Sequence, residues 1–175
     1  MKKITWILVL TLLVAAGTAF AQHPDGLGVG VGWQLGSSWE SPSDLGNALS
    51  LFIKAPQSSI YWGISADVLH LNDSRFWVSL TGDHYLIDST LIPNLNLGFF
   101  LGIGVYFKFD HYGSTYNGID LGVRVPIGLS WQPIDWFEVF FDVAPSIGFY
   151  SHFGNTSKVG IGGGWQGDIG IRFWF

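Results

Sequence analysis

Apolar and polar residues alternate along most of the chain after residue 26, and alternation with a period of two is typical of β-strands that have two different faces. In the segment 95–109 every odd position is apolar, while the even positions include Asn96, three glycines and Lys108. An even number of such strands lets an antiparallel sheet close with both chain ends on one side. Eight segments show the pattern, at about residues 26–36, 46–55, 59–70, 75–87, 95–109, 118–131, 136–149 and 165–175.

The two faces of these segments differ in composition. One face is almost continuously Leu, Ile, Val and Phe, whereas the other mixes glycine with isolated charges. A lipocalin-like barrel or a β-sandwich also alternates, but its outer face carries many charged and hydroxyl side chains. The pattern here is typical of a membrane barrel, in which lipid contacts the apolar face and polar residues fill the lumen. We therefore predict an all-β fold, an eight-stranded antiparallel up-and-down transmembrane β-barrel, with lumen glycines that fit its narrow interior.

The first residues have the features of a secretory signal peptide. Two lysines precede an apolar run, and Ala19 and Ala21 occupy the −3 and −1 positions of a cleavage site. The apolar run is too short to span a bilayer as a helix. We expect residues 1–21 to be removed and residues 22–175 to form the barrel. The chain has no cysteine, so no disulfide is expected.

Composition and charge exclude two classes of protein. Hydrophobic residues make up 48% of the chain and charged residues 12%, yet after residue 21 no apolar run reaches the roughly 20 residues that a transmembrane helix needs. Removal of Lys2 and Lys3 would reduce the basic residues from 8 to six against 13 acidic ones, a net charge of −7. Because nucleic-acid binding depends on basic residues that neutralise phosphates, we expect no nucleic-acid partner.

The C-terminal stretch "GDIGIRFWF" alternates and is closed by an aromatic residue. It resembles the signal by which the outer-membrane insertion machinery recognises its clients, carried here by Ile169, Ile171, Phe173 and Phe175. The mature chain is similar to small barrels of the OmpA and OmpW type, and residues 122–149 resemble an uncharacterised spirochaetal family of such barrels. The resemblance implies a bacterial outer-membrane location, with lipid, the insertion machinery and periplasmic chaperones as partners. We expect a monomer.

Isolated charges on the polar face are the main candidate site. A turn centred near Pro133 would set Arg124 across from Asp142. A hairpin centred near Asn155 would set Glu138 across from Arg172 and Asp142 across from Asp168. One interpretation is a salt-bridged plug that closes the lumen, and the other is a constriction or gate in a narrow conduit. The predicted lumen ionic network consists of Arg124, Glu138, Asp142, Asp168 and Arg172.

No residue pattern indicates catalysis, a cofactor or a metal. Some outer-membrane barrels modify lipids with His, Ser and an acid, but Ser151 and His152 are adjacent and would lie on opposite faces of a strand. The His-x-Ser motif of the deacylase barrels is missing. Four histidines lack the spacing of metal ligands; they are His70, His84, His111 and His152. Pro126 and Pro145 fall within predicted strands and suggest β-bulges.

The sequence therefore favours a non-enzymatic outer-membrane barrel. It would be a structural or surface-exposed protein, or a narrow channel for small solutes. A lipid-modifying enzyme of the outer membrane is one alternative. Another is a surface protein that binds a host molecule or other extracellular ligand through the loops Tyr112–Asn117 and His152–Gly162.

Deletion of Phe175 should impair insertion, because the resemblance implies that the terminal aromatic residue is part of the recognised signal. The measurement is the amount of heat-modifiable barrel in the outer-membrane fraction, compared with that of the full chain. Phe175→Tyr keeps an aromatic end and serves as the control. Recovery of the full chain as a soluble periplasmic monomer would contradict the membrane location.

Overall fold

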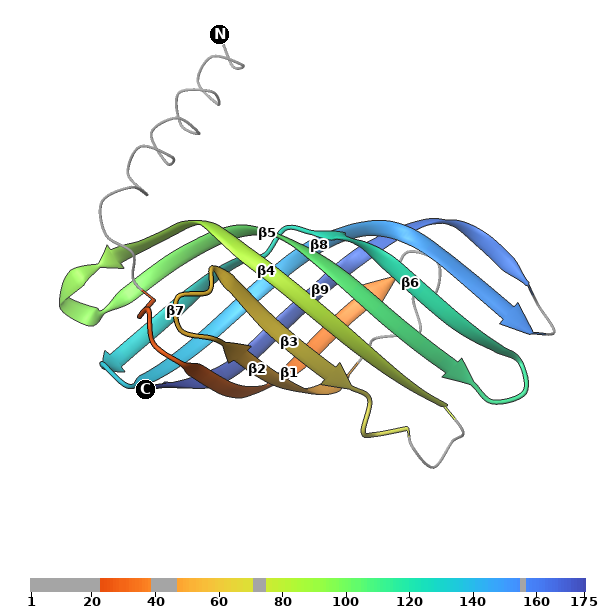
Figure 1. The fold of residues 1–175 in the computed structure, drawn as a ribbon, viewed down its shortest axis with the longest axis horizontal. Coiled ribbons are helices and arrows are strands. Elements are labelled where there is room, and N and C mark those ends of the chain that lie inside the picture. Colours follow the sequence, from red (N-terminus) through yellow and green to blue (C-terminus); the bar gives the residue numbers. More distant parts are fainter. Residues whose placement is uncertain (1–22, 39–46, 71–74, 155–156) are drawn as a thin grey trace, which may run out of the picture.

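The computed structural model describes residues 23–38, 47–70, 75–154 and 157–175, which form one long β-barrel (Figure 1). Within these residues no helix has the length and apolar character needed to cross a membrane. The elements are β1 (Gly28–Ser38), β2 (Ala48–Lys54), β3 (Ile60–Ala66), β4 (Arg75–Ile92), the short 3-10 helix η2 (Pro93–Leu95), β5 (Leu97–Tyr112), β6 (Tyr116–Arg124), β7 (Ile127–Ile134), β8 (Phe137–Gly154) and β9 (Lys158–Trp174).

The strands close into a ring in which every pairing is antiparallel. Neighbours in sequence pair with each other, β4 pairs with β5, and β9 returns to pair with β1. Both β6 and β7 pair with β5 on one side and with β8 on the other, so together they fill a single place in the ring. The barrel is therefore eight-stranded, and the predicted fold class is confirmed.

The two faces of the strands have the predicted orientation. On β2, Leu49, Leu51 and Ile53 point outward and are 46–57% exposed, whereas Ser50 and Lys54 point inward and are 0% and 4% exposed. The same division holds around the ring, because the strands alternate between a mainly apolar outer face and an inner face of small, polar or aromatic side chains. The interior is packed rather than hollow along most of its length.

Glycines on the inner face make room for large aromatic rings. Phe140 lies over Gly170, where an added Cβ would be 2.8 Å from the ring atom Cζ. Phe100 lies over Gly128 in the same way, and Phe100 is 1% exposed. A ring of eight strands is only just wide enough for side chains. The inward rings of Phe100 and Phe140 therefore each occupy the space left by a glycine on the neighbouring strand.

Pro126 and Pro145 interrupt the hydrogen-bond ladder without adding a residue, so the β-bulges expected there are wrong. The register of β8 against β6 continues unchanged against β7. The Val125 N–H donates to the Pro145 carbonyl at 3.0 Å, and the Gly102 N–H donates to the Pro126 carbonyl at 2.9 Å. Each proline thus keeps its acceptor and lacks only its donor. The missing donors explain why β6 and β7 are separate strands at one place in the ring.

Several strands extend further than the sequence pattern indicates. β4 continues to Ile92, with register shifts near Leu86 and Leu91. The hairpin of β8 and β9 keeps its pairing as far as His152 and Lys158. Most of the predicted loop 152–162 is therefore strand, because glycine-rich β9 continues to pair where its apolar alternation has faded.

The segment just before β1 and the C-terminus lie at the same end of the barrel (Figure 1). Leu27 and Phe175 exchange two backbone hydrogen bonds, of 3.0 and 2.9 Å. Residues 23–26 precede this pair, and the Lys54 ammonium donates to the Pro24 carbonyl at 3.0 Å. The segment before β1 is thereby attached to the barrel end that carries the C-terminus.

Candidate functional site

The polar interior of the barrel contains three features, which follow one another along its axis. The terminal cluster surrounds Arg172 at the end that carries the chain ends, and the central cluster surrounds Arg124. A cavity, called the cup below, lies on the far side of the central cluster and extends toward the β8–β9 hairpin. Charged residues from five strands, β4, β5, β6, β8 and β9, contribute to these features.

The central cluster consists of one arginine and three carboxylates from three other strands. Arg124, from β6, is 2% exposed. Its Nε lies 3.2 Å from an oxygen of Asp83, and its Nη2 lies 3.5 Å from Asp142 and 3.7 Å from Asp168. Its Nη1 donates to the side-chain oxygen of Gln166 at 2.6 Å. The guanidinium group therefore links β4, β8 and β9 across the lumen.

A hydrogen-bonded layer continues the central cluster to the opposite wall. Gln34 Nε2 donates to Asp168 at 3.3 Å, and the Ser79 hydroxyl donates to Gln34 at 3.4 Å. Ser50 donates to the second oxygen of Asp168 at 3.5 Å and shares a hydrogen bond of 2.7 Å with Ser65. This layer joins residues of β1, β2, β3, β4 and β9. Together with Arg124 it crosses the whole section of the barrel.

The terminal cluster is built on a closely paired Arg172 and Glu138. Arg172 Nη1 donates to both oxygens of Glu138, at 2.9 and 3.1 Å. The indole N–H of Trp174 donates to the same carboxylate at 2.8 Å. Glu138 is 0% exposed, so its charge is compensated entirely by these groups and by His23.

Aromatic rings surround the Arg172 guanidinium group. Its carbon lies 4.6 Å from the ring centroid of Phe140, 5.1 Å from that of Tyr61 and 5.5 Å from that of Trp174. Tyr85 stacks on Tyr61 at 4.1 Å. Cation–π contacts of this kind stabilise a desolvated arginine. The rings also fill the space between the terminal cluster and the barrel wall.

His23 closes the terminal cluster from the segment before β1. Its Nε2 lies 3.0 Å from Glu138, its Nδ1 lies 2.8 Å from Asp88, and its backbone N–H donates to Asp88 at 3.2 Å. Burial alone would lower the pKa of His23, but the charges and hydrogen bonds of Glu138 and Asp88 outweigh it and raise the pKa to about 9. A charged His23 therefore seals this end of the lumen.

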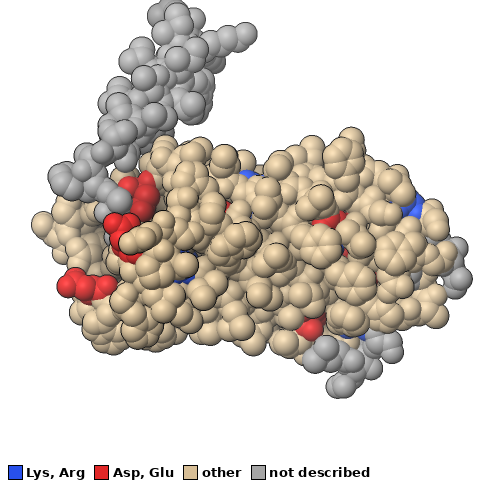
Figure 2. Space-filling view, viewed as in Figure 1, with Lys and Arg blue, Asp and Glu red and all other residues tan. Residues whose placement is uncertain are grey.

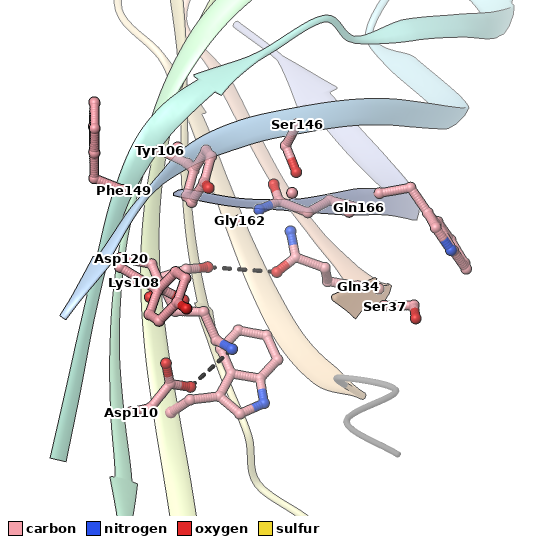
Figure 3. Close-up of a pocket in the computed structure, with 18 of the residues that line it drawn as sticks. Gln34, Ser37, Tyr106, Lys108, Asp110, Asp120, Ser146, Phe149, Gly162 and Gln166 are labelled. Atoms are coloured by element: carbon pink, nitrogen blue, oxygen red, sulfur yellow. Dashed lines mark hydrogen bonds and ion pairs between the residues drawn. The ribbon is translucent and has the colours of Figure 1, made fainter. Parts of the chain in front are cut away.

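The cup is a cavity of about 310 Å³ above the central cluster (Figure 3). Gln34 and Gln166 line it and also bind Asp168 and Arg124, so the same amides form its floor. On its wall the Lys108 ammonium lies 2.7 Å from Asp110 and 5.2 Å from the ring centroid of Trp77. The cup is thus a cavity with a polar lining, and its floor rests on the buried central cluster.

The five predicted network residues are all buried, with exposed fractions of 4% or less. The β8–β9 pairing sets Glu138 opposite Arg172 and Asp142 opposite Asp168, as the sequence suggested. The expected pairing of Arg124 with Asp142 across the strands is wrong, because Arg124 faces Ser146. The turn is centred near Asp135 rather than Pro133, and Arg124 reaches Asp142 diagonally.

The ion pairs divide the predicted network into two clusters and add members that sequence reasoning missed. Asp83 could have been found, since it ends the alternating run of β4 on the polar face. His23 and Asp88 could not, because the first precedes every strand and the second follows a register shift. Nothing in the sequence marks Gln34 and Gln166 as members of the central cluster, since a neutral amide is compatible with either a surface or a lumen.

The remaining predicted positions are placed as follows. Ile169, Phe173 and Phe175 face outward on β9 or just beyond it, 53%, 36% and 80% exposed. Ile171 shares that face and is half-buried. Their role as an insertion signal stays a prediction. Ala19 and Ala21 lie outside the described residues, as does the proposed cleavage site.

The other histidines contact a carboxylate, an amide, a backbone oxygen and an aromatic ring. His70 pairs with Asp67 at 2.9 Å, and His111 shares a hydrogen bond of 2.7 Å with Asn117. His84 bonds to the backbone oxygen of Ser59, and the ring of His152 lies 5.1 Å from that of Tyr150. Among the described residues, no three His, Asp or Glu side chains are grouped so that they could hold a metal ion.

Comparisons with known proteins give one family and one solved structure. The model of the family described as "Protein of unknown function (DUF3996)" matches residues 44–173. The crystal structure of Neisserial surface protein A is similar at a TM-score of 0.45 and 14% sequence identity, over 85% of this chain and 96% of that one. No curated protein matches the chain.

Arg124→Ala should destabilise the barrel by about 3–5 kcal/mol, because it leaves three buried carboxylates without their cation. A second change, Asp142→Asn, should recover part of the loss through coupling between neighbours. The measurement is a urea titration of refolding into lipid vesicles. Arg75→Ala removes an exposed arginine and should cost less than about 1 kcal/mol. Equal effects of the two alanine variants would contradict the burial of Arg124.

His23→Phe should remove a pH-dependent part of the stability. The folded-state pKa of His23, about 9, lies above its ordinary value of 6.5. Its contribution is therefore complete below pH 6.5 and is lost as the pH rises through about 9. The difference in unfolding free energy between wild type and His23→Phe should shrink over this range. His84→Phe, at a half-buried histidine, is the control, and a difference that does not change with pH would contradict the contact with Glu138 and Asp88.

Proposed function

We propose that this chain, which belongs to the DUF3996 family of proteins of unknown function, is a non-enzymatic outer-membrane barrel with a closed lumen. It is a surface-exposed protein and not a solute channel. The cup and the strand connections around it face the outside of the cell. Outer-membrane lipid, the insertion machinery and periplasmic chaperones are its proposed partners, and it acts as a monomer.

The outer surface supports a lipid-facing barrel. Large apolar side chains are exposed around the ring, for example Leu51 at 57%, Leu121 at 56% and Ile103 at 53%. Figure 2 shows one face of the molecule, on which charged side chains are sparse. A soluble protein rarely exposes a continuous apolar surface of this extent. Lipid is the solvent in which such a surface is stable.

The lengths of the strand connections support the orientation. The longest intervals between consecutive strands follow Ser38 of β1 and Ala66 of β3, and both of these strand ends lie opposite the barrel end that carries Phe175. Outer-membrane barrels combine short periplasmic turns with longer extracellular loops. The terminal cluster would accordingly face the periplasm, and the cup would face outward.

The closed lumen is the observation that favours a surface protein over a channel. Two clusters cross the interior in series, with Arg124 and Arg172 each 2% exposed. His23 and the aromatic rings around Arg172 fill the periplasmic side. A conducting path needs a continuous wet passage, whereas here the cup ends on the central cluster. The histidine contacts described above give no support to a lipid-modifying enzyme.

Planar-bilayer recordings test the closed lumen. The refolded wild type should give no steady single-channel current. The double variant Arg124→Ala, Arg172→Ala removes the cation of each cluster and should leak if the clusters are the barrier. A steady wild-type current, together with liposome uptake of small solutes, would establish the narrow-channel alternative instead.

Arginine substitutions on the outer face test the lipid contact. Val123 lies near the middle of the ring position that β6 and β7 share, and Val123→Arg should cost about 2–4 kcal/mol. Val159 lies near the β8–β9 hairpin, and Val159→Arg should cost about 0–1 kcal/mol. Both valines are exposed, at 54% and 76%. Refolding titrations in lipid vesicles give the comparison. Equal tolerance at the two sites would show that the outer face does not lie in a bilayer.

A further inference from the structure

The cup has the size and position of a small-molecule site. Its volume of about 310 Å³ is at the lower end of the range for ligand pockets, roughly 300–1,000 Å³. Six strands, β1, β4, β5, β6, β8 and β9, contribute side chains to its wall, and the amides of Gln34 and Gln166 form its floor. A rigid barrel wall holds these groups in place. A ligand of one or two rings would fit, whereas a folded partner would not.

The charges of the lining are balanced within the wall. Two lysines and two aspartates line the cup. Lys108 is paired with Asp110 at 2.7 Å and lies over Trp77, and Lys158 lies 5.3 Å from the ring centroid of Tyr150. Because the lysines and aspartates of the wall are equal in number, the wall itself carries no formal net charge that would attract an anion or a cation. This favours a neutral ligand.

Neutral hydrogen-bonding groups and aromatic rings supply the rest of the lining. Tyr106 packs against the backbone of Gly148, where an added Cβ would lie 2.7 Å from the tyrosine oxygen. The ring therefore lies close to the strand and borders the cavity (Figure 3). Ser146 and Gln166 lie nearby in the same view. Amides and hydroxyls both donate and accept hydrogen bonds, while the rings offer apolar faces.

We propose that the cup binds a neutral saccharide unit, either a free mono- or disaccharide or the terminal sugar of a larger glycan. A sugar ring presents C–H faces that pack on aromatic side chains and hydroxyls that pair with amides and hydroxyls. Both are present in the cup, together with a charge balance that selects against ionic ligands. The orientation of the cup toward the outside rests on the proposed function, but the binding chemistry does not.

Calorimetry with the refolded protein tests the proposal, with glucose, galactose, N-acetylglucosamine and lactose as probes. We expect saturable binding of at least one sugar, with little change between low and high salt because no charge attracts it. Ser146→Phe places a ring in the cup and should weaken binding by at least about tenfold, since it removes the space that a ligand needs. Ile147→Phe is the matched control, because Ile147 is the next residue of β8 and faces outward, 52% exposed.

Two further measurements make the result decisive. Tyr150→Leu removes a ring near the Lys158 side of the cup and should also weaken binding, so the test survives if Ser146→Phe does not fold, as judged by its heat-modifiable band. Binding of the refolded protein to an array of immobilised glycans distinguishes a terminal sugar from a free one.

Saturable binding only of charged probes, such as spermidine, citrate or lysine, would overturn the proposal. The proposal would also be overturned if no sugar bound. It would equally be overturned if sugar binding were as strong in Ser146→Phe and Tyr150→Leu as in Ile147→Phe. These outcomes would leave the closed, membrane-spanning barrel intact, because conductance and lipid contact are measured separately.

Discussion

Compensation of buried charge inside a narrow ring is the constraint on which the rest of this structure depends. A charge in an interior of low dielectric constant is costly unless it is paired and hydrogen-bonded. Arg124 meets this demand with carboxylates from three other strands, and Arg172 meets it with Glu138 and a shell of aromatic rings. Arg124 therefore ties together strands that are not neighbours in the ring, whereas Arg172 and Glu138 are cross-strand partners on adjacent strands. The same pairs that satisfy the charges close the lumen.

The aromatic rings and the glycines solve the packing problem that the charges leave. Phe100, Tyr106 and Phe140 are each 8% exposed or less, and each lies against a glycine on a neighbouring strand. Close packing of this kind excludes water from the clusters and strengthens their electrostatic interactions. This close packing ends at the cup, where the β9 glycines in the wall are not all covered by an aromatic ring. Space for a ligand therefore remains on the side of the barrel that the cup occupies.

The sequence predicts the barrel because a period of two and an apolar outer face are properties of each strand by itself. It also places Glu138 opposite Arg172, since the β8–β9 hairpin is regular and its centre can be located. The position of Arg124 could not be obtained in the same way, because one irregular turn near Asp135 shifts every pairing of β8 with β6 and β7. His23 lies beyond the reach of any periodic pattern, since it precedes the first strand and acts through tertiary contact alone. Local regularity is readable from sequence, whereas long-range compensation between charges is not.

The pairing of the first strand with the last, called the seam here, affects where the barrel would open under a mechanical force. β1 pairs with β9 along its whole length, from Gly28 to Ser38, and the pair of Leu27 and Phe175 extends it further. β2 pairs with β3 only from Leu49 to Lys54. Chain ends are therefore not the mechanical weak point of this barrel. A pulling force would separate the short strands β2 and β3 before the longer seam, so the ring would open there while β1 and β9 stayed paired.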